Sequence, residues 1–286
     1  SSTSEEPNAL MELGSGEFKE PNVKATTVKL TEGLESRSQN HLGPLGFDLM
    51  AVTDLLHPFL GAGFYYKTFM WPKSFWEKVY EPAIRNAAGL GSLSGSPDPH
   101  TYDKGLFHCD VLIIGGGPSG LAAALEAGRA NLNVIIADDD FEIGGRLNSE
   151  NFFINNDASS DWVSNTLVEL SQLKNVRIMK RTAIYGSYDH GIFGGLEIKF
   201  DHYKHGNKKP RQILWKIYTK YSILCSGATE RSIAFGNNDR PGIMLAGSLR
   251  AYLNRWSVCP GRNIIVFTNN DDGFKTAIDL KAKNIN

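Results

Sequence analysis

One stretch of the chain decides the fold, and it reads Cys109-Asp110-Val111-Leu112-Ile113-Ile114-Gly115-Gly116-Gly117-Pro118-Ser119-Gly120. An apolar run typical of a β-strand leads directly into a glycine turn, and helix-forming residues continue to position 129. In such a turn Gly115 permits the tight bend, Gly117 lets backbone approach a pyrophosphate, and Gly120 allows close packing of helix and strand. Pro118 and Ser119 begin a helix whose N-terminal amides and partial positive charge suit phosphate groups. The stretch therefore predicts a Rossmann-type unit of the α/β class.

A second apolar run, residues 133–137, ends at an acid, Asp138. A carboxylate at this distance from the glycine turn accepts hydrogen bonds from the ribose of a dinucleotide, and it repels a 2′-phosphate. Asp138 is the predicted ribose ligand. Asp139 and Asp140 are most simply solvated loop acids, and either takes over this role if the strand is one or two residues longer.

Two further turns carry small residues that suit a cofactor. Gly144, Gly145 and Arg146 resemble the glycine pair that lines the far side of the pyrophosphate in flavoproteins of the glutathione-reductase type, although Arg146 is equally well an ordinary surface charge. Ser226 and Gly227 follow a strand-like run, where small side chains let backbone approach the cofactor. Gly145, Arg146, Ser226 and Gly227 are therefore candidate cofactor-binding residues.

The remaining patterns describe a β-rich excursion and the start of a second unit. An amphipathic helix begins near Ser159 or Ser160, and strand-like runs follow at 176–179, 183–188, 196–202, 213–218 and 221–225. Residues 263–267 form one more apolar run before an Asn- and Asp-rich turn and a helical stretch. We expect this to begin a second Rossmann-like unit in which two acids at the helix start serve the helix dipole rather than a phosphate.

Composition shifts divide the chain into four segments. We expect an N-terminal segment at 1–88, a Gly-, Ser- and Pro-rich linker at 89–105, the first dinucleotide-binding domain with its β excursion at 106–259, and the incomplete second unit at 260–286. Within the first segment, one short helix is predicted near 48–56 and a kinked helix near Pro82. The aromatic run 64–72 suits a buried interdomain or intersubunit seam.

Charge and hydropathy exclude several classes of partner. Thirty Lys and Arg nearly balance 31 Asp and Glu, so no global field attracts nucleic acid. The aliphatic runs are far shorter than the roughly 20 residues that span a bilayer, and the polar N-terminus is unlike a secretory signal, so a cytoplasmic protein is expected. Three dispersed cysteines predict neither a disulfide framework nor a metal site.

Several segments outside the glycine turn share the pattern of one family. They are Glu6-Pro7-Asn8-Ala9-Leu10, Arg37-Ser38-Gln39-Asn40, Gly63-Phe64-Tyr65-Tyr66-Lys67-Thr68-Phe69-Met70-Trp71-Pro72, Tyr188-Asp189-His190, Asn237-Asn238-Asp239-Arg240-Pro241-Gly242 and Phe267-Thr268-Asn269-Asn270-Asp271. Together they resemble the alpha subunits of heterotetrameric sarcosine oxidases over almost the whole chain. The implied fold is a two-dinucleotide-domain oxidoreductase, preceded by the tail of a ferredoxin-like segment without cluster cysteines.

The resemblance also implies a function for the assembly. This subunit would hold tightly bound NAD on its first dinucleotide fold, while a beta subunit carries FAD and oxidises sarcosine to glycine. Electrons would pass to an FMN at the alpha/beta interface and then to oxygen, giving hydrogen peroxide, with gamma and delta subunits completing the complex. A folate-binding domain that forms methylene-tetrahydrofolate is expected after the last residue, so we expect this chain to be an inactive fragment of a longer subunit.

Two other interpretations fit the same residues. The chain resembles, less closely, the opine oxidases and hydrogen-cyanide-forming glycine dehydrogenases, in which case FAD is the ligand of this chain. Alternatively, the nucleotide fold is a structural scaffold, and all chemistry occurs on other subunits. No residue is assigned as a catalytic acid, base or nucleophile. His190 is the one to test, although a hydrogen-bonded loop histidine is the simpler interpretation.

Overall fold

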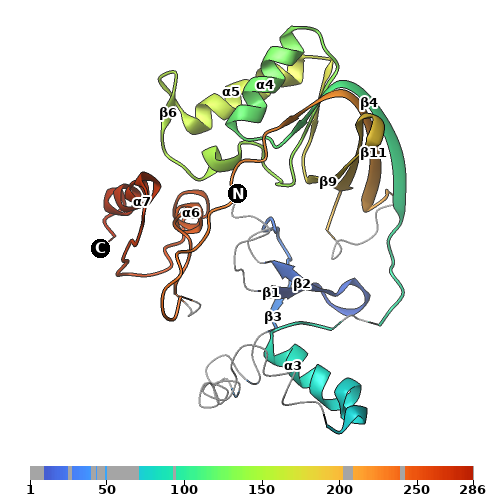
Figure 1. Ribbon diagram of the computed structural model, residues 1–286, viewed down its shortest axis with the longest axis vertical. Coiled ribbons are helices and arrows are strands. Elements are labelled where there is room, and N and C mark those ends of the chain that lie inside the picture. Colours follow the sequence, from blue (N-terminus) through green and yellow to red (C-terminus); the bar gives the residue numbers. More distant parts are fainter. Residues whose placement is uncertain are drawn as a thin grey trace. The chain divides into compact units, whose positions relative to one another are not determined.

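The computed structural model describes residues 10–24, 28–39, 43, 49, 71–92, 95–201, 209–238 and 242–285. The chain divides into two compact units at the peptide between His100 and Thr101 (Figure 1). The larger unit contains residues 101–201 and the described residues from 209 onward. The smaller unit contains the described residues before Thr101.

A six-stranded sheet forms the centre of the larger unit. Its strands, in spatial order, are β8 (Val176–Met179), β5 (Val134–Ala137), β4 (Tyr102–Ile114), β11 (Gln212–Leu224), β10 (Ile192–Ile198) and β9 (Thr182–Tyr188). The first four are parallel to one another, and β10 pairs antiparallel with both β11 and β9. This is a parallel nucleotide-binding sheet with an antiparallel extension, as the β-rich excursion predicts.

Two helices cover one face of the parallel strands. They are α4 (Pro118–Arg129) and α5 (Ser159–Gln172), which lie side by side in Figure 1. Ile113 and Ile136 of the sheet pack with Leu121 of α4 and Leu170 of α5, and all four are fully buried. Their neighbours along the strands point to the other face because side chains alternate, and that face buries a second cluster. Its members are Cys109, Leu112, Ile135, Ala137, Met179, Phe193 and Ile217. The Rossmann-type α/β fold is thus confirmed.

The central strands are longer than their apolar runs. β4 and β11 are each 13 residues long and pair from Tyr102 with Gln212 to Ile114 with Leu224. The two predicted runs 213–218 and 221–225 are therefore one strand, because β4 supplies hydrogen-bonding partners along the whole length. In the same way the last residues of the predicted linker, from Tyr102, already belong to β4. Gly105 of β4 has no side chain because the ring of Trp215 occupies that space. A Cβ on Gly105 would lie 2.1 Å from an atom of the ring.

The strand predicted at 196–202 occurs earlier, at Ile192–Ile198. It includes the adjacent Gly194 and Gly195, which suggest no strand from propensity alone. The pairing with β9 shifts register between these two glycines, and such a bulge tolerates residues without side chains. A 3₁₀ turn, η8 (Asp189–Gly191), joins β9 to β10.

Short elements complete the larger unit. A 3₁₀ turn, η7 (Gly145–Asn148), and a two-residue hairpin, β6 (Phe153–Ile154) and β7 (Asp157–Ala158), lead into α5. The residue before α5 is Ala158, so neither predicted serine cap is present. Ser159 instead donates its hydroxyl proton to the carbonyl of Glu150 at 2.8 Å.

The C-terminal part is helical. It contains α6 (Ala246–Arg250), a π-helical turn η9 (Ala251–Arg255) and α7 (Asp271–Ala282), which share a small core of Leu249, Leu253 and Leu280. The strand predicted at 263–267 is absent. No strand in the described part of the chain pairs with this segment, and Ile265 is 94% exposed. The expected second Rossmann-like sheet is therefore not formed by these residues.

The smaller unit is built on a three-stranded antiparallel sheet. The spatial order of its strands is β2 (Glu20–Lys24), β1 (Leu10–Leu13) and β3 (Ser36–Ser38). Along the chain, a 3₁₀ turn η1 (Gly16–Phe18) lies between β1 and β2. A second segment runs through η5 (Lys73–Phe75) and a π-helical turn η6 (Trp76–Tyr80) into α3 (Glu81–Ala87). Pro82 lies in the first turn of α3, where its missing N–H is tolerated. The ferredoxin-like character of this unit stays a prediction.

Two sequence predictions for the smaller unit concern other residues. Of the helix predicted near 48–56 only Leu49 is described, and residues 64–70 of the aromatic run lie outside the described residues. At the end of that run Trp71 is described, and it is 82% exposed in this chain. The predicted linker begins as part of this unit, because Gln39 donates to the carbonyl of Gly89 at 3.1 Å and Gly91 donates to Asn22 at 2.8 Å. Among the described helices, none is long and apolar enough to cross a membrane.

Candidate dinucleotide-binding site

Two glycines of the loop after β4 are required by backbone packing. Gly115 has a φ of 106°, and a Cβ there would lie 2.3 Å from the carbonyl oxygen of Cys225. A Cβ on Gly120 would lie 1.9 Å from the carbonyl oxygen of Gly115. The chain after β11 thus crosses directly against the glycine turn, and α4 starts directly on it. These contacts match the roles that the sequence assigns to both residues.

Gly117 is different, because none of the described residues explains its missing side chain. Its φ of −73° is open to any residue, and the one described atom within 4 Å of a Cβ there would be the Cα of Gly145, at 3.9 Å. Gly145 has a φ of 55° and faces Gly117 in turn. The space beside Gly117 therefore suits a ligand that approaches the backbone closely, as a pyrophosphate does.

The backbone holds these two glycine segments together. The Gly144 N–H donates to the Gly116 carbonyl at 2.9 Å. The sequence indicates that Gly144 belongs to a glycine pair near the pyrophosphate, but it does not indicate this bond, because backbone pairing leaves no mark in residue type. At the start of α4, the first helical bond runs from the Leu121 N–H to the Gly117 carbonyl at 2.9 Å. The amides of Ser119 and Gly120 precede that bond, so they have no partner within the helix.

Asp138 lies against the glycine loop at the end of β5. One carboxylate oxygen accepts from the Gly116 N–H at 2.5 Å, and the other accepts from the Asp140 N–H at 2.8 Å. The pKa of Asp138 is raised, mainly by burial, although these two backbone hydrogen bonds act to lower it. Since each carboxylate oxygen can accept more than one hydrogen bond, the group retains acceptor capacity for ribose hydroxyls.

The acids after Asp138 behave differently from each other. Asp139 is exposed, as expected of a solvated loop acid. Asp140 is not solvated, which corrects that interpretation. Arg255 of η9 binds both its carboxylate oxygens, with Nη1 at 2.7 Å and Nη2 at 2.9 Å, and the two side chains are 9% and 8% exposed. The partner lies 115 residues away in sequence, so no local pattern indicates the pair.

Arg146 takes part in a charged network rather than standing alone. Its guanidinium contacts Glu150 at 2.5 Å and Asp272 at 2.9 Å. Arg250, which is 2% exposed, contacts the same two acids at 3.1 and 2.9 Å. Asp272 is in the first turn of α7, which Asn270 caps by accepting from the Asp272 N–H at 3.0 Å. The acids at this helix start therefore have the structural role that the sequence predicts.

The network makes the attachment of α7 sensitive to acid. Partial burial raises the pKa of Asp272, but the hydrogen bond from Arg146 and the charges of Arg250 and Arg146 outweigh it, so the pKa is lower than usual. A carboxyl with a lowered folded-state pKa contributes stability above its unfolded value of about 3.9, and this is lost as pH falls through the folded value. We expect the protection of α7 amides, measured relative to their intrinsic exchange rates, to fall below about pH 4, while the protection of α4 is kept. An Asp272→Asn variant should show the faster α7 exchange already at pH 7, and equal exchange in parent and variant at that pH would contradict the assignment.

The remaining candidates lie in turns. Gly227 has a φ of 72°, and a Cβ there would meet no atom of the described residues within 4 Å, so these residues leave open space beside the turn after β11. His190 is exposed in η8 with a φ of 63°. Its turn leads into Ile192, which pairs with Tyr218 in the middle of β11 and not at the end that carries the glycine loop. Among the described residues, no group of three or more His, Cys, Asp or Glu is placed to hold a metal ion.

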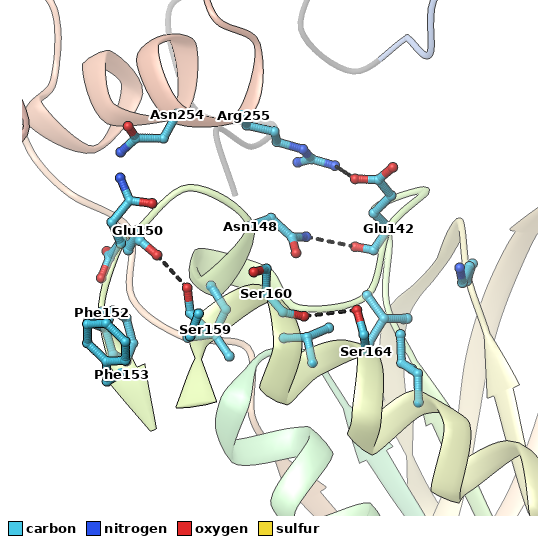
Figure 2. A pocket seen from close by; sticks show the side chains of 17 residues that line it. Glu142, Asn148, Glu150, Phe152, Phe153, Ser159, Ser160, Ser164, Asn254 and Arg255 are labelled. Atoms are coloured by element: carbon cyan, nitrogen blue, oxygen red, sulfur yellow. Dashed lines mark hydrogen bonds and ion pairs between the residues drawn. The ribbon is translucent and has the colours of Figure 1, made fainter. Parts of the chain in front are cut away.

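A cavity of about 680 Å³ lies beside this site (Figure 2). η7, the β6–β7 hairpin, α5 and η9 line it, with Asn254 and Arg255 on one side and Ser159, Ser160 and Ser164 on the other. Neither the glycine loop nor Asp138 contributes to its lining. The cradle formed by Gly117 and Gly145 is therefore a separate feature of the surface.

The sheet, its covering helices and the glycine loop form a dinucleotide-binding fold of the kind on which FAD-dependent oxidoreductases are built. Residues 110–183 match the family described as FAD dependent oxidoreductase. The chain is also similar to L-proline dehydrogenase from P. horikoshii, with a TM-score of 0.59 and 19% identity over 98% of this chain and 43% of that one. That likeness concerns the fold alone.

The particular family follows from closer relatives. The chain is 50% identical to sarcosine oxidase subunit alpha of Rhizobium meliloti (strain 1021) over 98% of its length and 28% of that protein. It is 40% identical to the subunit of the same name from Corynebacterium sp. (strain P-1), over 68% of its length and 20% of that protein. The chain belongs with the sarcosine oxidase alpha subunits, and it spans about a quarter of the length of the relatives it matches.

Proposed function

We propose that this chain binds the ADP part of NAD on the loop after β4, as one portion of a sarcosine oxidase alpha subunit. The single observation that carries the proposal is Gly117, whose missing side chain no contact with a described residue requires. A pyrophosphate beside that backbone accounts for the glycine, and the helix terminus behind it supplies amide donors and partial positive charge.

Each candidate residue has a role in this proposal. Gly115, Pro118 and Gly120 shape the turn, and the Ser119 amide donates to phosphate. Asp138 accepts from the adenosine ribose, with exposed Asp139 beside it. On the opposite side of the ligand we place a set of residues from the two other turns: Gly145, Arg146, Ser226 and Gly227. Arg146 would have to release part of its network with Glu150 and Asp272 to reach a phosphate.

For the complete protein, we propose the reaction that the relatives' name describes. Sarcosine, water and oxygen give glycine, formaldehyde and hydrogen peroxide, or methylene-tetrahydrofolate in place of formaldehyde when tetrahydrofolate accepts the carbon. The beta, gamma and delta subunits, with FAD and FMN, would belong to the same heterotetramer. The support is 50% identity over 98% of this chain.

FAD in this chain is the second candidate, and the match of residues 110–183 to the FAD dependent oxidoreductase family favours it. FAD and NAD share the ADP part, so the cradle accepts either. The test is to denature the purified chain, release the ligand and identify it by mass and by visible absorbance. Colourless NAD supports the first proposal, and yellow FAD supports the second. A protein that contains and binds neither would contradict both.

Replacing Asp138 with alanine should weaken dinucleotide binding by about 1.5 to 3 kcal/mol, or roughly ten- to hundredfold in Kd. The variant loses the charge-assisted hydrogen bonds to the ribose and frees the Gly116 N–H that the carboxylate accepts from. Equilibrium titration of ligand-free protein measures the change. Asp139→Ala is the matched control, because its exposed side chain holds no part of the loop. A larger loss in the control would move the ribose contact to Asp139.

A further inference from the structure

Arg255 is held more firmly than a surface arginine. It is the last residue of η9, its side chain is 8% exposed, and its guanidinium lies 4.8 Å from the ring centre of Phe141 and 4.9 Å from that of Trp256. Both terminal nitrogens bind Asp140 in the bidentate arrangement. A planar guanidinium that packs against two neighbouring rings, with both oxygens of its acid engaged, fixes the position of that acid.

Asp140 in turn positions the predicted ribose ligand. Its N–H donates to Asp138 at 2.8 Å, and its carbonyl accepts from the Arg181 N–H at 2.9 Å. The Asp138 carboxylate therefore has two anchors, the Gly116 amide from the glycine loop and the Asp140 amide from the segment that Arg255 holds. Movement of Asp140 would remove the second anchor and let the carboxylate rotate.

Arg255 also changes the charge next to the ribose site. Asp138, Asp139 and Asp140 are consecutive, and both neighbouring charges disfavour ionisation of Asp138. The ion pair with Arg255 neutralises Asp140 where it is buried. Without Arg255, Asp140 would keep an unpaired charge in the interior or would turn the loop toward water.

We propose that Arg255 is a positioning residue for dinucleotide binding, acting through Asp140 to hold the Asp138 carboxylate against the adenosine ribose. This rests on the proposed function, since it presumes a ribose at Asp138. Arg255 belongs to the C-terminal helical segment, whereas the ribose and pyrophosphate positions lie at the ends of β4 and β5. The proposal therefore links these two parts of the larger unit.

The test compares Arg255→Gln with the parent chain, using two ligands in equilibrium titrations of ligand-free protein. One ligand is NAD, and the other is its analogue without the adenosine 2′-hydroxyl. We expect Arg255→Gln to weaken NAD binding by about tenfold, as expected for one charge-assisted hydrogen bond. The analogue, which already lacks that hydrogen bond, should lose less than about threefold. Arg129→Gln is the matched control, because Arg129 forms an exposed ion pair with Glu169 between α4 and α5.

A packing role for Arg255 predicts a different result. If the side chain only stabilises the loop, both ligands weaken equally, and that outcome overturns the proposal, as does an unchanged affinity for NAD. Asp140→Asn keeps a side chain of the same size and guards against a misfolded Arg255 variant. It should reproduce the selective loss for NAD, and an equal loss for both ligands in this variant also overturns the proposal. If the folded parent chain binds neither ligand, the proposed function fails instead.

Discussion

Gly117→Val is expected to abolish dinucleotide retention while leaving the fold intact. Among the described residues, a Cβ on Gly117 meets only the Gly145 Cα at 3.9 Å, and its φ of −73° suits valine, so these residues leave room for a Cβ. The same side chain would fill the space in which a pyrophosphate approaches the backbone. We expect the purified variant to contain less than about a tenth of the parental ligand, since even one overpacked methyl group costs about 1 to 3 kcal/mol. Ligand released on denaturation, measured per mole of folded protein, gives the result.

Two other glycines serve as controls for that experiment. Gly120→Ala should destabilise the fold itself, because its Cβ would lie 1.9 Å from the Gly115 carbonyl oxygen. Gly236→Ala should change neither property, because no atom of the described residues lies within 4 Å of its Cβ position. The assignment of Gly117 to the ligand requires a folded variant without ligand. Full ligand content in folded Gly117→Val would contradict it, and the cradle would then have no function.

The predictions that succeed are those carried by consecutive residues. The strand, the glycine turn and the helix around Gly115 and Gly120 follow from residues that are neighbours in the chain, and the structure places them as expected. The acid at the end of β5 follows in the same way. Each signal is local because a strand, a tight turn and a helix start are defined by the conformations of adjacent residues.

The predictions that fail depend on partners elsewhere in the chain. The sequence predicts that Asp140 is a solvated acid, but in the folded chain it binds Arg255, which lies 115 residues away in sequence. The two strands expected at 213–218 and 221–225 form one continuous strand, β11, because β4 pairs with it on both sides of the expected break. Conversely, the apolar run at 263–267 forms no strand, because no described strand lies beside it. An apolar pattern states what a segment prefers, and hydrogen-bonding partners decide whether a strand forms.

Ion pairs between residues far apart in sequence support the site, and no sequence motif predicts them. Arg255 reaches the loop after Asp138, and Arg250 and Asp272 reach η7 beside the glycine pair through Arg146 and Glu150. Both sets of contacts join the C-terminal helices to the dinucleotide half of the same unit. Changes in the C-terminal segment are therefore expected to alter ligand binding without touching the ligand.

The purified chain is expected to produce no hydrogen peroxide from sarcosine by itself. Oxidation of the N-methyl group removes two electrons, so it needs a redox centre and a group that holds the amine beside it, and the proposed role of this chain, binding the ADP part of NAD, supplies neither. The chain spans only 28% of its Rhizobium meliloti relative. In α7, Phe274 and Ile278 are exposed one turn apart, an apolar surface that suits further protein contacts.

The measurement follows peroxide formation with sarcosine and oxygen, first with the chain alone and then with separately purified beta, gamma and delta subunits and a full-length alpha subunit. Glycine replaces sarcosine in the control, because it lacks the N-methyl group that is oxidised. We expect peroxide to form only in the complete assembly. Because enzyme turnover numbers are typically 1 to 1,000 per second, the assembly should form peroxide at least about a thousandfold faster than the background of the chain alone. Sustained sarcosine-dependent turnover by this chain alone would place the oxidising centre within it, and the flavin would then have to lie on the glycine loop after β4.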